Sequence, residues 1–189
     1  AAAGIKEAGN TYRRWSPKIV VDQLEHLQRT YGVRNVKFAD ELFVLNKAHV
    51  EGVCNGIIER GLELNIWAYA RVDTVKEGMA PLLKRAGVNW VALGIEAANP
   101  RVREHVQKGY DQDDIRRCVA DLRAHGIYII ANYIFGLPED DIDTMQETLA
   151  LALDLNCEFT NLYTAMAYPG SDLYTQAIRE GWQLPDDWA

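Results

Sequence analysis

Two hydrophobic periods alternate along the chain, one typical of buried strands and one typical of amphipathic helices. Short runs rich in β-branched and aromatic residues predict strands, and each is followed by apolar positions at helical spacing. The first helix starts at Ser16-Pro17, an N-cap and a first-turn proline. The predicted strands are 33–39, 64–70, 88–95, 127–135 and 159–167, and the predicted helices are 17–31, 47–60, 76–86, 101–107, 113–125, 142–155 and 171–179.

Strands that alternate with helices of this length pair in parallel through right-handed crossovers, which predicts an α/β fold. No linker rich in Gly, Pro or Ser divides the chain, so it is one domain or one piece of one. We expect an N-terminal segment over 1–16, the α/β domain over 17–182 and a C-terminal tail over 183–189. The strand–helix units are fewer than a full barrel needs, and the helix from Pro17 has no strand before it.

Polar residues recur where the predicted strands end. The strand 127–135 carries Asn132 inside an apolar run, where an unpaired polar group is costly, and it ends at Gly136 and Pro138. Ligands of parallel α/β folds bind at the carboxyl ends of the strands. In chain order these ends carry Asp40 and Glu41, Arg71 and Asp73, Glu96, Asn132 and the segment 164–169.

The mixed charges of these strand ends suit a zwitterionic ligand. Glu96 would bind an ammonium group or a ribose hydroxyl, and Arg71 and Lys108 would bind a carboxylate. The four histidines all fall on predicted helices, where a solvated face is expected, so a Ser-His-Asp or Cys-His mechanism has no support. The chain also lacks the glycine-rich motifs that cradle phosphates.

Composition and charge narrow the class of protein further. The chain has 189 residues, of which 48% are hydrophobic and 25% charged, as in an ordinary globular domain. Its net charge of −7 argues against general binding to nucleic acid or to an anionic membrane. No apolar run approaches the ~20 residues of a membrane helix, and the first residues lack a signal peptide's apolar core. A cytoplasmic location is therefore expected. The three cysteines are far apart, so we interpret them as small buried hydrophobic residues and predict no metal ligands.

In chain order, short motifs on successive units resemble the radical S-adenosylmethionine (radical SAM) superfamily, and most of all its cobalamin-associated branch. The resemblance covers roughly residues 12–182, and its specificity comes from the order and spacing of the motifs. They are Arg13-Arg14-Trp15-Ser16-Pro17, Phe38-Ala39-Asp40-Glu41-Leu42-Phe43, Ala70-Arg71-Val72-Asp73, Gly94-Ile95-Glu96-Ala97 followed by Lys108-Gly109, Phe135-Gly136-Leu137-Pro138-Glu139 and Tyr168-Pro169-Gly170-Ser171.

This resemblance implies a partial parallel (βα)6 TIM-like barrel. In the family, a [4Fe-4S] cluster reductively cleaves SAM to a 5′-deoxyadenosyl radical, which abstracts hydrogen from a substrate. The parent protein would need an electron donor, and a cobalamin would come from another domain. The SAM contacts that it implies are Ala39, Asp40 and Glu41 for the methionyl amino group, Arg71 and Glu96 for the amino acid and ribose, Lys108 for the carboxylate, Asn132 for the ribose and Met166 for the adenine.

The sequence departs from the family at the cluster. The family holds its cluster with three cysteines in a CxxxCxxC loop after the first strand, because such clusters need thiolate ligands. That motif does not occur in this chain. We therefore expect strands two to six of the barrel with the first unit incomplete or missing, and a chain that does not form the radical by itself. Ala97 also stands where the family commonly has serine.

A second interpretation stays open, in which the chain is a non-catalytic α/β binding or interaction domain. An unpaired sheet edge would then invite a protein partner. Glu96 would pair with Arg71 across neighbouring strands, Asp40 and Glu41 would cap a helix, and Asn132 would bond a backbone group. Likewise, Lys108 would be a helix C-terminal cation and Met166 a packing residue. Neither interpretation identifies the small-molecule substrate.

Overall fold

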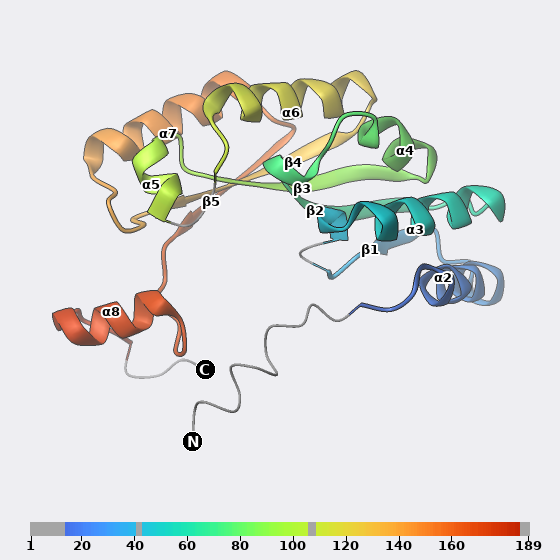
Figure 1. The fold of residues 1–189 in the computed structure, drawn as a ribbon, viewed down its shortest axis with the longest axis horizontal. Coiled ribbons are helices and arrows are strands. Elements are labelled where there is room, and N and C mark those ends of the chain that lie inside the picture. Colours follow the sequence, from blue (N-terminus) through green and yellow to red (C-terminus); the bar gives the residue numbers. More distant parts are fainter. Residues whose placement is uncertain (1–13, 41–42, 106–108, 186–189) are drawn as a thin grey trace.

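The computed structural model describes residues 14–40, 43–105 and 109–185. Its centre is a five-stranded, all-parallel sheet in the order β1-β2-β3-β4-β5, so each strand pairs with its neighbours in the sequence. The sheet is curled into part of a barrel, with helices between the strands (Figure 1). The predicted α/β fold, a partial TIM-like barrel, is confirmed.

The predicted elements are all present within the described residues, with differences at their ends. Helix α7 has the predicted bounds, whereas β1 and β5, the two edge strands, are shorter than predicted. The strands are β1 Asn35–Lys37, β2 Asn65–Arg71, β3 Val88–Glu96, β4 Tyr128–Phe135 and β5 Phe159–Thr164. The helices are α2 Pro17–Tyr31, α3 Lys47–Glu59, α4 Met79–Arg85, α5 Pro100–His105, α6 Gln112–Ala124, α7 Ile142–Leu155 and α8 Asp172–Glu180, with short 3-10 turns η1 Phe43–Leu45 and η2 Val72–Thr74.

Side-chain caps explain where several helices begin. The Ser16 hydroxyl accepts a hydrogen bond from the Ile19 N–H at the start of α2, as the sequence predicts. At the start of α7, Asp141 accepts from the Thr144 N–H and the Thr144 hydroxyl accepts from the Asp141 N–H. This reciprocal pair satisfies two backbone donors that have no partner inside the helix.

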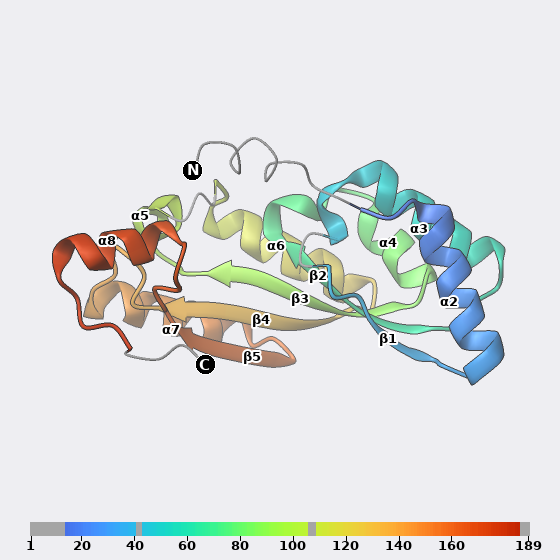
Figure 2. The ribbon, with the colours of Figure 1, turned by 90° about the horizontal axis from the view of Figure 1, so that it is seen from below.

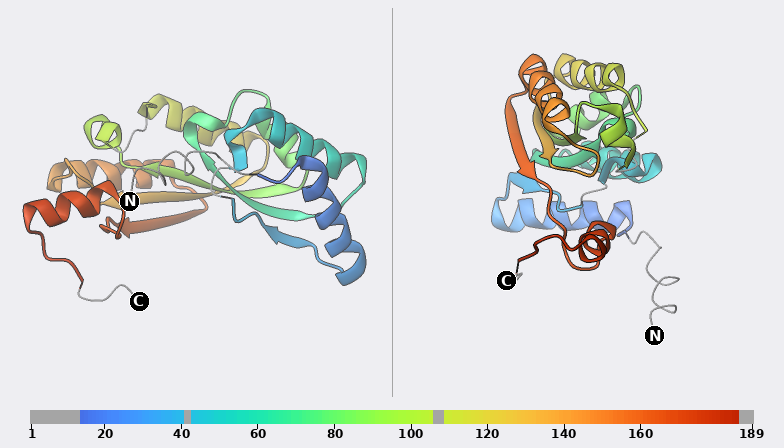
Figure 3. Two further views of the ribbon diagram at one scale, coloured as in Figure 1. Left: turned by 60° about the horizontal axis from the view of Figure 1, so that its bottom comes forward. Right: turned by 90° about the vertical axis from the view of Figure 1, so that its left-hand side faces the viewer.

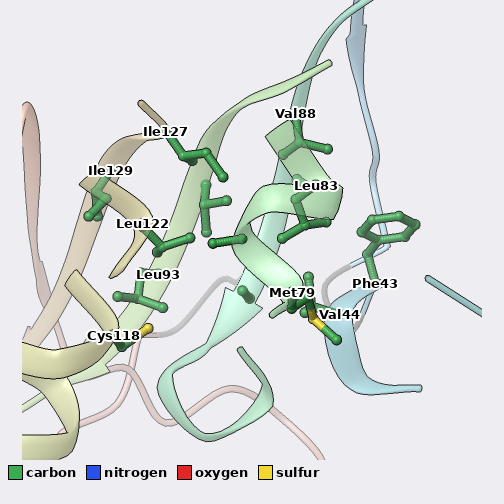
Figure 4. Close-up of a cluster of buried hydrophobic side chains, with 14 of the residues drawn as sticks. Phe43, Val44, Met79, Leu83, Val88, Leu93, Cys118, Leu122, Ile127 and Ile129 are labelled. Carbon is green, nitrogen blue, oxygen red and sulfur yellow. The ribbon is translucent and has the colours of Figure 1, made fainter. Parts of the chain in front are cut away.

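One face of the sheet packs against helices and forms the core. In β2 and β4, alternate residues are buried, as the two-residue period of a strand requires, and in β3 Ala92 is buried in addition to its neighbours Val91 and Leu93. Leu93 and Ile129 from this face lie in one apolar cluster with Leu83 of α4 and Leu122 of α6 (Figure 4). Burying each such side chain contributes roughly 1.5–3 kcal/mol, so this layer holds the strands in place.

The intervening residues form the other face of the sheet, here called the inner face, and the strand register arranges them in rows. Trp67, Trp90 and Tyr128 form one row. The next row contains Tyr69, Ala92, Ile130 and Phe159, and a hollow of ≈ 310 Å³ is lined by Trp67, Trp90, Ile130 and Phe159. Aromatic and apolar groups thus cover the part of the inner face nearer the N-terminal ends of the strands.

The carboxyl ends of the last three strands lie at one end of the molecule. Figure 2 shows β3, β4 and β5 side by side, with their arrowheads directed to the end where α5 and α8 lie. Helix α8 is set apart from α6 and α7, which lie along the sheet (Figures 1 and 3). None of the helices in the described ranges is long and apolar enough to cross a membrane.

Candidate functional site

A row of mainly polar residues crosses the inner face close to the carboxyl ends of the strands. Arg71 of β2 pairs in register with Gly94 of β3, Gly94 with Asn132 of β4, and Asn132 with Asn161 of β5. We call these four residues the polar row. It brings together two of the residues that the sequence singled out, Arg71 and Asn132. Gly94 between them contributes no side chain, as suits a place where a ligand approaches the backbone.

The guanidinium of Arg71 is held by Asp73. Its Nε and Nη2 atoms donate to the two carboxylate oxygens of Asp73 at 2.9 and 2.8 Å. The hydrogen bonds from Asp73 raise the pKa of Arg71 above its ordinary value. Within the described part of the chain, the ion-pair partner of Arg71 is therefore Asp73 and not Glu96, so the cross-strand pair proposed from the sequence is wrong.

Glu96, the last residue of β3, has an unusual backbone conformation. Its φ of 68° lies in the left-handed region that favours glycine, and the Ala97 N–H donates to the Ile95 carbonyl at 3.0 Å. A hydrogen bond between residues i and i+2 around a positive φ defines a strained γ-turn. The register with β4 also shifts between Gly94 and Glu96. Such strained conformations persist only where the surrounding structure holds them in place, and they are common at ligand sites.

Asn132 is oriented by a residue that the sequence analysis missed. The Nδ2 atom of Asn161 donates to Oδ1 of Asn132 at 2.9 Å, and Asn132 itself makes only a long contact of 3.5 Å to the Ile130 carbonyl. Asn132 therefore bonds a backbone carbonyl, as the alternative interpretation expects, and is also bonded by a side chain of the next strand. The sequence does contain a signal for Asn161. Alternate side chains of a strand share one face, and Asn161 alternates with Phe159 and Tyr163.

The segment that follows β1 carries further residues that are predicted to contact the ligand. Ala39 and Asp40 line a cavity of ≈ 640 Å³, together with Phe38 and His49. Asn46 caps α3 by accepting from the His49 N–H at 2.9 Å, so Asp40 is not that helix's cap. Glu41 lies outside the described residues, and its assignment stays a prediction.

His49 corrects the expectation that every histidine lies on a solvated helix face. Its exposed fraction is 6%, and burial lowers the pKa of its imidazole. Its Nδ1 atom is buried without a hydrogen-bond partner in the structure as described.

Met166 and Lys108 are two further contacts predicted from the sequence. Met166 follows β5 and is 46% exposed, and its sulfur accepts a hydrogen bond from the Tyr168 hydroxyl at 3.5 Å. Lys108 lies outside the described residues, so its predicted contact is untested.

The cysteines and acidic residues offer no metal site in the described ranges. No group of three or more His, Cys, Asp or Glu side chains there could hold a metal ion. Cys54 and Cys118 are buried and Cys157 is partly buried. Burial raises the pKa of the Cys54 and Cys118 thiols to about 12, so both remain protonated thiols. This part of the chain therefore does not fit a [4Fe-4S] cluster.

An incomplete parallel barrel places the chain among α/β-barrel domains, a class whose ligands bind at the carboxyl ends of the strands. Comparison with models of protein families identifies the family. The model of the radical SAM superfamily matches residues 4–152, so the chain belongs to this superfamily, as its motifs indicate.

Relatives and solved structures agree with this membership. The chain is 29% identical over 180 residues to an uncharacterized methyltransferase of Pyrococcus horikoshii, covering 95% of this chain and 39% of the relative. It is 30% identical over 167 residues to the anaerobic magnesium-protoporphyrin IX monomethyl ester cyclase of Rubrivivax gelatinosus, covering 87% of this chain and 30% of the cyclase. The chain thus spans well under half the length of these relatives.

A solved structure shares the fold. The radical S-adenosylmethionine methyltransferase TsrM from Kitasatospora setae, with cobalamin and a [4Fe-4S] cluster bound, superposes with a TM-score of 0.73. The match has 24% sequence identity and covers 80% of this chain and 29% of TsrM. It supports the partial barrel that the strand pattern predicts.

Proposed function

We propose that the polar row and the adjoining γ-turn at Glu96 bind S-adenosylmethionine in a radical SAM enzyme. The observation that carries the proposal is the polar row itself, in which Arg71 and Asn132 lie in one register at the carboxyl ends of the strands. The membership in the superfamily supports SAM as the ligand.

The residues fit the chemistry of SAM, which has an ammonium group, a carboxylate, a sulfonium, a ribose and an adenine. The Glu96 carboxylate accepts from the ammonium group or a ribose hydroxyl, and the Asn132 amide bonds the ribose. Ala39 and Asp40 offer backbone and carboxylate oxygens to the methionyl amino group, and the backbone near Met166 lies against the adenine. Glu41 and Lys108 complete this set from outside the described residues.

The apolar rows deeper on the inner face have a complementary task. Trp67, Trp90, Ile130 and Phe159 line an open apolar hollow below the polar row, which would cover one side of a bound ligand, and a drier site strengthens the hydrogen bonds that orient a ligand. In this proposal the chain orients SAM and shields it.

The cluster, the electron donor and the substrate belong to the whole protein. The superfamily implies a [4Fe-4S] cluster that supplies the electron for cleavage of SAM, and its ligands would lie outside the described residues. Methyltransferases and a cyclase are among the relatives, so we propose a radical reaction of one of these kinds on a small molecule. Cobalamin, as in TsrM, would be bound by another domain.

Equilibrium binding of SAM to the whole protein, with Glu96→Gln compared with the unaltered protein, tests the proposal. We expect the substitution to weaken binding by about 1–3 kcal/mol, the cost of removing a charged hydrogen-bonding partner. Glu63→Gln is the matched control, because Glu63 is an exposed carboxylate just before β2, at the opposite end of the strand from Arg71.

Unchanged SAM affinity in Glu96→Gln would remove Glu96 from the site. If the unaltered protein binds no SAM at all, the other interpretation gains support, in which the chain is a non-catalytic binding domain.

A further inference from the structure

The segment that carries Glu96 is clamped by side chains from later in the chain. The Tyr110 hydroxyl donates to the Gly94 carbonyl at 2.9 Å, just before Glu96. Just after Glu96, the Arg103 guanidinium donates to the Ala97 carbonyl at 2.8 Å and also to the carbonyl of Ala98. The γ-turn is therefore held on both sides of Glu96.

Two further polar side chains complete the clamp at Ala98. The Thr148 hydroxyl of α7 accepts from the Ala98 N–H at 3.0 Å, and the Gln112 amide of α6 donates to the Ala98 carbonyl at 3.2 Å. Three helices, α5, α6 and α7, thus fix the course of the chain directly after β3.

Burying the Arg103 guanidinium costs free energy, because the cation loses its hydration. It is 1% exposed, and burial lowers the pKa of its guanidinium. Its third acceptor is the Tyr110 carbonyl, at 3.2 Å from Nε, and its Nη2 atom has no hydrogen-bond partner in the described part of the chain. The carbonyls of residues 97, 98 and 110 thus replace a carboxylate partner for this cation. The Tyr110 ring, 5.9 Å from the guanidinium carbon, and the charge of Asp111 also favour the cation. Burying it is still expensive, because its hydrogen bonds go to neutral acceptors, which compensate its lost hydration incompletely.

The strained backbone at Glu96 needs neighbouring residues that are held in place, and Arg103 bonds two of them. A glutamate at φ 68° would relax toward negative φ unless its neighbours were held. The planar guanidinium suits the task, since it reaches several carbonyls at once, whereas a lysine ammonium acts as a single compact donor on a flexible stem.

We propose that Arg103 is a positioning residue that holds the Glu96 carboxylate in its SAM-binding orientation, with the Tyr110 hydroxyl as its counterpart on the other side of the turn. This inference rests on the proposed function. Arg103 itself does not touch SAM; it acts through the backbone of Ala97 and Ala98.

A double-mutant cycle on SAM affinity in the whole protein tests the inference. Arg103→Lys is measured alone and together with Glu96→Gln, with thermal unfolding recorded for each variant. We expect Arg103→Lys to weaken SAM binding about tenfold in the unaltered background and less than about twofold beside Glu96→Gln. The coupling arises because a misplaced carboxylate matters only if the carboxylate is present. Arg101→Lys, on the same helix but 57% exposed, is the matched control and should leave affinity unchanged.

The possible outcomes separate this inference from the proposed function. Equal weakening in both backgrounds, or no weakening in either, overturns the positioning role, since a purely structural contact would not depend on Glu96. If Glu96→Gln alone leaves affinity unchanged, the proposed function fails first and the inference with it. If Arg103→Lys does not fold, Tyr110→Phe replaces it in the same cycle, because it removes only the hydroxyl that bonds Gly94. If the effects of Tyr110→Phe and Glu96→Gln on SAM affinity were then additive, the proposed positioning role would be wrong.

Discussion

The Asn161 amide on β5 donates a hydrogen bond to Oδ1 of Asn132 on β4, with 2.9 Å between the two atoms. These residues are direct partners in the register of two parallel strands. The bond fixes the direction of the Asn132 amide on the inner face, and so decides whether its oxygen or its nitrogen is available to a ligand.

We therefore expect Asn161→Ala to weaken SAM binding several-fold. Loss of the bond also costs about 1 kcal/mol of unfolding free energy, because Oδ1 of Asn132 loses its partner. The control is Asn89→Ala, which removes a bond of the same kind, 2.9 Å long, to Asn65 at the other end of the sheet, together with the bond that Lys84 donates to Asn89. It should lower stability without changing SAM affinity. Equal loss of affinity in both variants would contradict a specific role for Asn161.

Glycine in place of Glu96 separates stability from binding. Since glycine adopts a positive φ without steric cost, Glu96→Gly should raise the free energy of unfolding by about 0.5–1 kcal/mol while SAM binding is lost. Glu139 also has a positive φ, 70°, in the turn closed by the hydrogen bond from the Asp140 N–H to the Leu137 carbonyl. Glu139→Gly should give a similar gain in chemical denaturation with affinity intact. Retained binding in Glu96→Gly would show that its carboxylate is dispensable.

Glu158 should make stability depend on pH. Burial by itself raises the pKa of its carboxyl, but the hydrogen bond from the Ile129 N–H, at 2.8 Å, and the Arg123 guanidinium outweigh burial and lower it. Because the folded pKa is depressed, the stabilisation is complete above the unfolded pKa, about 4.3, and is lost as pH falls through the folded value.

The measurement is the free energy of unfolding of Glu158→Gln from pH 7 down to pH 3. We expect the variant to be less stable by about 1 kcal/mol at pH 7, with the difference shrinking below about pH 4. Glu63→Gln, on an exposed carboxylate, should follow the unaltered protein throughout. A difference that stays constant with pH would contradict the proposed electrostatic origin.

The cysteines should behave as core residues. Cys54 and Cys118 are 1% and 7% exposed, and with their pKa raised to about 12 neither thiol ionises near neutral pH. A thiol reagent at pH 8 should leave both unmodified in the folded protein and label all three cysteines in denaturant. Mass spectrometry of the labelled peptides identifies the modified positions. Rapid labelling of Cys54 in the folded state would show that α3 opens.

Much of the fold follows from local patterns. The bounds of α7 were predicted to the residue, and those of β3 and β4 to within one, because their hydrophobic periods and flanking turn residues are local signals. The edge strands β1 and β5 were predicted too long, since each has a neighbour on one side only and the pattern cannot show where that pairing stops. The superfamily could likewise be recognised from motif order, as the family match confirms.

The polar residues at the strand ends can be identified from local patterns alone, since alternation and turn residues are encoded within a few positions. The partners that hold these residues became visible in the folded chain. They are Asp73 for Arg71, Asn161 for Asn132 and the buried Arg103 for the turn at Glu96. Strand register and the path of loops bring such groups together, and both depend on packing between segments distant in the chain. The pattern along one strand therefore predicts which polar groups stand there, and the packing of the sheet and its helices determines which partners they bond.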